Sequence, residues 1–230
     1  MNEKKQTKKA LLMSVLSMVL CVAMLVGMTF AWFTDTASTG VNKIQAGNLD
    51  VKLMYSADMQ TWKEATDQTK LFDDNALWEP GHTQVVYLKV VNNGNLALKY
   101  EAGFSKNYTS NRGKNVNGDW YRVDNYLKIG TAETETAYAS REAVWSAIAA
   151  TEKTLAKDVM LTNDWITLDP KTESKPFAVA IYMPTSVGNE ANASRLRPSS
   201  VSSLGIEVRA TQATVESDSF GTTYDANAAT

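Results

Sequence analysis

Alternating apolar and polar residues recur along the chain after residue 48 and predict a series of β-strands. The clearest alternation covers residues 49–55, 96–104 and 204–212, as expected for strands with one buried face. Four further segments are rich in apolar or β-branched residues and are also predicted to be strands: 84–92, 119–129, 164–168 and 175–184. Short strands separated by Gly, Asn and Pro turns predict an all-β, mainly antiparallel fold, a jelly-roll β-sandwich.

An Asn-Gly pair lies between two of these strands and favours a direct hairpin. Asn93 and Gly94 separate residues 84–92 from residues 96–104, and Asn-Gly suits a tight turn because both residues adopt positive φ readily. We therefore expect these two strands to pair with each other. The alternative is a longer connection that places them in different sheets.

One helix is expected to interrupt the strands, near residues 140–157. Ser140 can cap its first turn, and Glu142 suits the positive end of the helix dipole. One face carries apolar side chains at helical spacing: Val144, Trp145, Ile148, Ala149 and Leu155. Such a stripe is more typical of contact with the core than of a groove for a partner.

A long apolar run near the N-terminus predicts export. Four lysines within the first nine residues precede a charge-free run from Ala10 to Thr34, which is the layout of a secretory signal. Small residues at Thr29 and Ala31 place the cut after Ala31, so residues 1–31 would be a signal peptide and Trp32 the new N-terminus. The run is also long enough to cross a bilayer, so a retained anchor is the alternative and would be the only membrane contact. In both cases the rest of the chain lies on the far side of a membrane.

The remainder of the chain is predicted to be one domain without disulfides. The only cysteine, Cys21, lies inside the apolar run after the bulky Leu20, a position that does not suit lipid attachment. Residues 32–215 are expected to form the jelly-roll domain, and the small, polar residues 216–230 a disordered tail. The chain has 23 Lys and Arg against 25 Asp and Glu, and this mildly acidic balance argues against nucleic acid as a partner.

Few residues suit catalysis. His82, the single histidine, follows the turn Glu79-Pro80-Gly81 and suits a solvated loop. One histidine cannot supply the multi-histidine sets of the common zinc peptidases. Asp73-Asp74-Asn75 lacks the spacing of a calcium loop, and no nucleophile elbow or nucleotide fingerprint is present. We predict no catalytic, metal or cofactor-binding residues and no enzyme activity, although a catalytic carboxylate pair stays open.

Several blocks spread over the chain match a known family. The most specific is Thr29-Phe30-Ala31-Trp32-Phe33-Thr34-Asp35, followed by Ile44-Gln45-Ala46-Gly47-Asn48-Leu49-Asp50-Val51. Weaker blocks are Glu79-Pro80-Gly81, residues 90–100, Met183-Pro184, Gly188-Asn189-Glu190 and Ala210-Thr211-Gln212-Ala213. Together they resemble the camelysin/TasA family of exported bacterial matrix proteins. The resemblance implies a secreted or cell-surface jelly roll, released by a SipW-type signal peptidase, that assembles into biofilm matrix fibres. The family also carries a metallopeptidase label.

A mechanism for fibre growth follows from an open sheet edge. Such an edge exposes backbone N–H and C=O groups with which an extended segment can pair. We expect residues 32–46 to add a strand to the next copy, or to a related matrix subunit, and the strand-donating residues to be Trp32, Phe33, Thr34, Val41 and Ile44. This head-to-tail contact does not close and therefore grows a filament. Alternatively, the segment pairs within its own sheet as a first strand.

Two rival functions remain from the sequence. One is a secreted or surface metallopeptidase of the camelysin type. The other is a monomeric surface adhesin whose long loops, residues 105–118 and 186–203, hold a ligand.

Overall fold

The computed structural model describes residues 13–19, 48–104, 108–157 and 159–213. The chain divides into two compact units, Met1–Gln45 and Ala46–Thr230. In the first unit, residues 13–19 are helical and their side chains are exposed. No helix in the described ranges is both long and apolar enough to cross a bilayer. The predicted tail, residues 216–230, falls outside these ranges.

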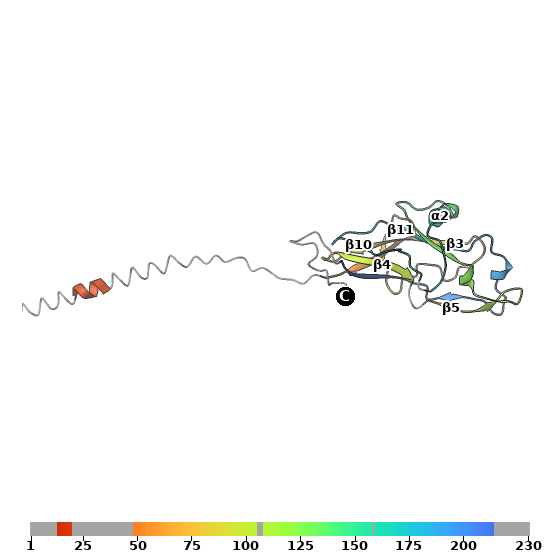
Figure 1. Ribbon diagram of the computed structural model, residues 1–230, viewed down its shortest axis with the longest axis horizontal. Helices are drawn as coiled ribbons and strands as arrows, with labels where there is room; N and C mark the ends of the chain where they lie inside the picture. The colour runs from red at the N-terminus through yellow and green to blue at the C-terminus, as the bar shows by residue number, and fades with distance from the viewer. Residues whose placement is uncertain (1–12, 20–47, 105–107, 158, 214–230) are drawn as a thin grey trace, which may run out of the picture. The chain divides into compact units, whose positions relative to one another are not determined.

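The second unit is a sandwich of two antiparallel sheets (Figure 1). The larger sheet has the order β2-β1-β3-β11-β8-β9. Its strands are β1 (Val51–Ser56), β2 (Lys63–Glu64), β3 (Thr83–Asn92), β8 (Lys128–Glu133), β9 (Lys153–Thr154) and β11 (Phe177–Tyr182). The smaller sheet has the order β10-β4-β13, with β4 (Leu98–Phe104), β10 (Ile166–Leu168) and β13 (Ile206–Gln212). The predicted all-β, antiparallel sandwich is confirmed.

Two short ladders and three short helices complete the described part of this unit. One ladder joins β5 (Thr109–Ser110) to β12 (Val201–Ser202), and the other joins β6 (Gly113–Lys114) to β7 (Trp120–Tyr121). The helical elements are η1 (Val123–Tyr126), α2 (Arg141–Ile148) and η2 (Asn189–Ala191). The two segments expected to be long loops, 105–118 and 186–203, therefore contain short regular elements held against each other.

The core lies between the two sheets. Its fully buried side chains include Leu88, Ala102, Phe104, Ile129, Val179 and Ile181. All six residues of β11 are buried, because β4 lies over one face of the larger sheet and α2 over the other (Figure 1). Each large apolar side chain buried in this way stabilises the fold by about 1.5–3 kcal/mol.

The predicted hairpin at Asn93-Gly94 is wrong. β3 pairs with β1 and β11 in one sheet, whereas β4 pairs with β10 and β13 in the other, so the turn crosses between the sheets. Gly94 does not adopt positive φ. It is instead needed for close approach, because a Cβ there would lie 2.5 Å from the Asn48 carbonyl oxygen. The buried Asn92 side chain braces the crossing through its bonds to Gly94 N, Leu96 O and Asp169 O.

The predicted helix is real but shorter than expected. Ser140 caps it by accepting a hydrogen bond from Ala143 N at 3.2 Å. The helix ends at Ile148, because Thr151 turns the chain there by donating to the carbonyl oxygens of Ile148 and Thr131. Leu155 is buried in the core but lies beyond the helix.

The predicted strand over residues 119–129 is also wrong as one element. It is split into β7, η1 and the start of β8. The break occurs at Asp124, a buried carboxylate that accepts hydrogen bonds from Tyr108 Oη and Ser110 Oγ, both at 2.7 Å. These bonds fasten η1 to β5, so the chain cannot continue as one extended strand.

Candidate functional site: a groove between the sheet edges

A groove runs along one side of the sandwich, between β1 and β13. One part has a volume of about 720 Å³ and is bounded by Val51 and Leu53 on one side and by Ile206 and Val208 on the other. The other part has a volume of about 490 Å³ and reaches Trp78, Leu127 and Leu155. The two parts share lining residues, among them Leu71 and Leu204, so they form one continuous groove.

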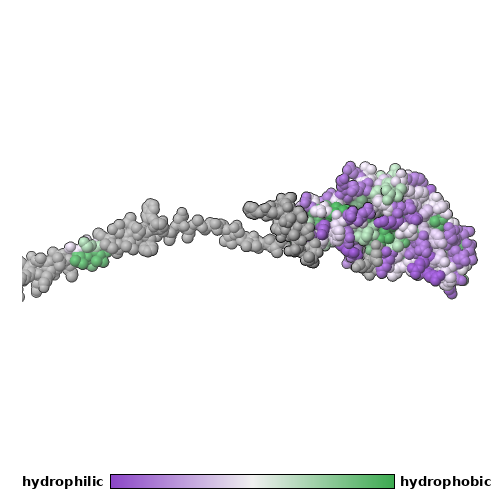
Figure 2. Space-filling view, in the orientation of Figure 1, coloured by the Kyte–Doolittle hydropathy of each residue, from purple (hydrophilic) through white to green (hydrophobic). Residues whose placement is uncertain are grey.

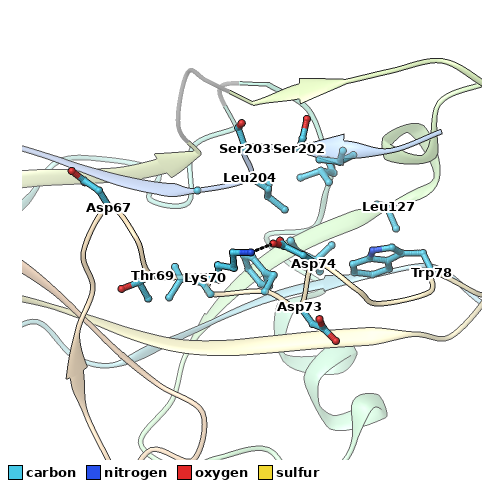
Figure 3. A pocket seen from close by; sticks show the side chains of 16 residues that line it. Asp67, Thr69, Lys70, Asp73, Asp74, Trp78, Leu127, Ser202, Ser203 and Leu204 are labelled. Carbon is cyan, nitrogen blue, oxygen red and sulfur yellow. Dashed lines mark ion pairs between the residues drawn. The ribbon is translucent and has the colours of Figure 1, made fainter. Parts of the chain in front are cut away.

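Apolar side chains line this groove without being fully covered. They are half-buried and pack against the edge of the core: Leu53, Leu71, Phe72, Trp78, Leu204, Ile206 and Val208. In Figure 3, Leu204 points from one wall toward Lys70 and Asp74 on the other. Covering half-buried apolar surface of this kind with a further apolar segment is favourable, because it removes that surface from water.

The wall opposite β13 is formed by residues 65–74 and is held by local hydrogen bonds. Ala65 N donates to Leu53 O at 2.8 Å, and Asp73 N donates to Gln84 Oε1 at 2.8 Å. Between them, Thr69 N donates to Thr66 O at 2.8 Å. The bonds from Ala65 and Asp73 tie both ends of the wall to strands of the larger sheet, so the shape of the groove is set before any partner arrives.

Most charged side chains along the groove are acidic. Asp67, Asp73, Asp74 and Glu207 line it, and Lys70 is the one cation among its lining residues. Lys70 Nζ lies 2.5 Å from Asp74 Oδ2 (Figure 3). The hydrogen bond to Asp74, and then its negative charge, raise the pKa of Lys70.

The backbone of β13 offers hydrogen-bonding groups along the same groove. Just beyond the ends of β13 and β4, Ala213 N donates to Ala97 O at 2.9 Å, and in an antiparallel pair every second residue faces the partner strand. Glu207, Arg209 and Thr211 therefore face β4, while the N–H and C=O groups of Ile206, Val208 and Ala210 face outward. Within the part of the chain that the structure describes, no strand pairs with this outer edge.

None of the sequence-predicted site residues falls within the described residues. Those predicted for cleavage are Thr29, Ala31 and Trp32, and those predicted to donate a strand are Trp32, Phe33, Thr34, Val41 and Ile44. The groove itself was not predicted, because one of its walls, residues 65–74, comes from a segment interpreted as irregular. A usable signal was present in that segment: Leu71, Phe72 and Trp78 are large apolar residues in an otherwise polar stretch.

The one histidine is packed against an aromatic ring. The His82 ring lies edge-on to Trp78, with centroids 4.9 Å apart, and its Nε2 lies 3.3 Å from Gln84 Nε2. His82 lies in the loop just before β3, as expected, and is half-buried. Trp78 lines the groove, and His82 supports it from outside the lining.

The residues present do not fit a zinc-peptidase centre. A catalytic zinc needs three protein ligands, usually including two or more histidines, and the full sequence has one histidine and one cysteine. Nowhere in the described segments do three or more His, Cys, Asp or Glu residues lie in positions to hold a metal ion. No catalytic step through a metal can be derived from these side chains.

Comparison with known proteins identifies the family. No curated protein sequence matches the chain. A family profile described as camelysin metallo-endopeptidase matches residues 6–127, which include β1, β3, β4 and the wall formed by residues 65–74. The resemblance seen in the sequence is thereby confirmed at the level of the family. Since this match covers more than half of the 230 residues, the chain belongs to the camelysin metallo-endopeptidase family.

Proposed function

We propose that this protein is an exported structural subunit of a bacterial extracellular matrix, which polymerises when residues 32–46 of one copy occupy the groove of the next. Export and cleavage after Ala31 by a SipW-type signal peptidase would free Trp32 as the N-terminus. The partners are then the signal peptidase and further copies of the chain or related matrix subunits. N-terminal sequencing of the secreted protein tests the cleavage site.

The observation that carries this proposal is the combination of groove and strand edge. Ile206 and Val208 present half-buried side chains to the groove, and at its rim their backbone groups pair with no strand among the described residues. A single extended segment can satisfy both, since its backbone extends the sheet while alternate side chains enter the groove. A globular partner surface could cover the apolar side chains but would leave the strand edge unpaired.

Residues 32–46 have the length and the composition for this role. Fully extended they reach up to about 50 Å, whereas the seven residues of β13 extend about 24 Å. The segment is therefore long enough to cover β13 and still leave a connection to its own β1. Its apolar residues, Trp32, Phe33, Val41 and Ile44, supply side chains for the groove.

The experiment is to delete residues 32–46 from the secreted protein and to examine the product by electron microscopy. We expect monomers in place of filaments, with the thermal unfolding of the domain retained. Leu204→Asp, which places a charge inside the groove, should give the same result in the full-length mature chain. Leu196→Asp is the matched control, because Leu196 is 89 % exposed and lies outside the groove. Undiminished filaments after the deletion would reject the proposal.

A secreted metallopeptidase is the second candidate, because the family description names that activity. It requires that the purified protein cleave casein, that a chelator abolish the cleavage, and that His82→Ala abolish it as well. We expect no chelator-sensitive cleavage, since the described residues lack a ligand set for zinc. Filaments and proteolysis are measured separately, so either result stands without the other.

A further inference from the structure

Three cationic side chains surround one exposed tryptophan at the β6–β7 ladder. Trp120 is 49 % exposed. Its ring centroid lies 5.2 Å from Arg112 Cζ, 5.2 Å from Lys114 Nζ and 5.6 Å from Arg197 Cζ. We call these four residues the basic patch. Any two of its cations therefore lie within about 11 Å of each other.

Backbone contacts hold the basic patch together. Lys114 is paired with Trp120 across the β6–β7 ladder, and Lys114 N donates to Arg197 O at 2.8 Å. Gly113 allows this approach, because a Cβ there would lie 2.6 Å from the Arg197 carbonyl oxygen. The cations thus come from two segments about eighty residues apart in sequence and are brought together by the fold rather than by a run of basic residues.

Within the described ranges, the positive charges of the basic patch have no acidic partners. None of the ion pairs between described residues includes Arg112, Lys114 or Arg197. Asp124, the buried carboxylate near this ladder, already accepts hydrogen bonds from Tyr108 and Ser110. Like charges at a separation close to the screening length of about 8 Å repel each other, so binding of an anion would relieve this repulsion.

We propose that the basic patch binds an acidic polysaccharide, a polymer of sugars that carry carboxylates. Arginine and lysine recognise carboxylates through charge-assisted hydrogen bonds, and the indole ring offers a flat apolar face for a sugar ring. The end of the domain that bears β5 in Figure 1 is strongly hydrophilic in Figure 2, as expected for a surface that binds a polar polymer.

A single-stranded nucleic acid suits the same surface less well. Its binding uses several aromatic platforms along a basic track, whereas beside Trp120 the next aromatic residue, Tyr121, is buried. A compact patch with one exposed aromatic ring instead matches one or two charged sugars.

The proposal is separate from filament growth, because no residue of the basic patch lines the groove. The double variant Arg112→Gln/Arg197→Gln should therefore form filaments normally. A variant that loses polysaccharide binding and keeps its filaments tests the basic patch alone. A variant that loses its filaments and keeps polysaccharide binding tests the groove alone.

The test is isothermal titration of the full-length secreted protein with polygalacturonate, with neutral dextran and oligothymidine of similar length as comparison polymers. We expect polygalacturonate to bind, with an affinity that falls as salt is raised, and dextran not to bind. Both Arg112→Gln/Arg197→Gln and Trp120→Ala should weaken binding about tenfold. Lys63→Gln/Lys157→Gln is the matched control, because it removes two exposed charges that lie outside the described ion pairs.

Three results would overturn the proposal. The first is no binding of polygalacturonate at low salt. The second is an equal loss of affinity in the Lys63→Gln/Lys157→Gln control, which would show that affinity depends on the net charge of the protein and not on the basic patch. The third is tighter binding of oligothymidine than of polygalacturonate, which would assign the basic patch to nucleic acid.

Discussion

β11 and β13 are strands of similar length, yet their surroundings differ. All six residues of β11 are buried, whereas none of the seven residues of β13 is fully buried. β11 lies between β3 and β8 and is covered on both faces, while among the described strands β13 pairs with β4 alone. β11 is apolar throughout, whereas in β13 the apolar Ile206, Val208 and Ala210 alternate with polar or charged residues. The two strands therefore differ both in their composition and in their neighbours.

The difference between β11 and β13 shows where added contacts could still stabilise this domain. β11 is buried along its whole length and paired with a strand on each side, so a new contact there would first have to displace an old one. Along β13 the half-buried side chains and the outward backbone groups lie on the same groove, and one added strand would complete both. The predictions below test this contrast.

The largest expected difference is in the response to truncation of leucine. Leu88, in β3 beside β11, is 0 % exposed, so Leu88→Ala should lower the free energy of unfolding by about 2–5 kcal/mol. Leu204 is half-buried in the groove, so Leu204→Ala should cost about 1 kcal/mol. Urea unfolding of the two variants measures both values. Equal losses would mean that the groove is as tightly packed as the core.

A smaller difference is expected between two adjacent proline substitutions in β13. Arg209→Pro removes an N–H that faces β4, whereas Val208→Pro removes one that faces the groove. Proline is tolerated at the open side of an edge strand, so Arg209→Pro should cost about 2 kcal/mol more than Val208→Pro in urea unfolding. Val208→Pro should nevertheless abolish filaments.

Val208→Ala is the control for the proline pair, since it shortens the side chain and keeps the N–H. It should weaken filament formation without abolishing it. Normal filaments from Val208→Pro would show that the outer edge of β13 is not used in assembly.

The smallest expected effect concerns alkaline pH and the tyrosine at the end of β11. Burial of Tyr182 in β11, and then its hydrogen bond to Glu152, raise its pKa to about 12. Between pH 10 and 12 the folded protein keeps this proton while the unfolded chain loses it, so stability is full below pH 10 and falls as pH rises through that window. Tyr182→Phe should flatten the decline in melting temperature. No tyrosine lines the groove, so filaments should persist until the fold itself melts, and dissociation well below pH 10 would contradict this.

Strand periodicity predicted much of this fold because it reports local burial. The segments 49–55, 84–92, 96–104, 175–184 and 204–212 all contain strands close to the expected bounds. The errors arise where a side chain from elsewhere decides the local structure. Asn92 and the close approach of Asn48 to Gly94 prevent the hairpin, and the bonds accepted by Asp124 break the predicted strand at residue 124. Neither effect is visible in a single stretch of sequence.

The groove could not be predicted for the same reason. Its two sides, residues 65–74 and 201–208, are separated by more than a hundred residues and meet only once both sheets have formed. The predicted donor side chains, Trp32, Phe33, Val41 and Ile44, were recognisable as apolar residues in a polar segment. Sequence patterns thus suggested the donated segment, and the folded structure adds a surface that can receive it.

The most direct test uses cysteine, since the only natural one, Cys21, lies in the predicted leader. Mature Ile44→Cys protein is mixed with mature Ile206→Cys protein under filament-forming conditions and oxidised. We predict a disulfide between the two different chains, seen as a mixed dimer on a non-reducing gel. The comparison is the double variant Ile44→Cys/Ile206→Cys, which carries both cysteines in one chain. If only this variant forms a cross-link, and its product migrates as a monomer, the segment fills its own groove. That result would contradict strand donation between copies.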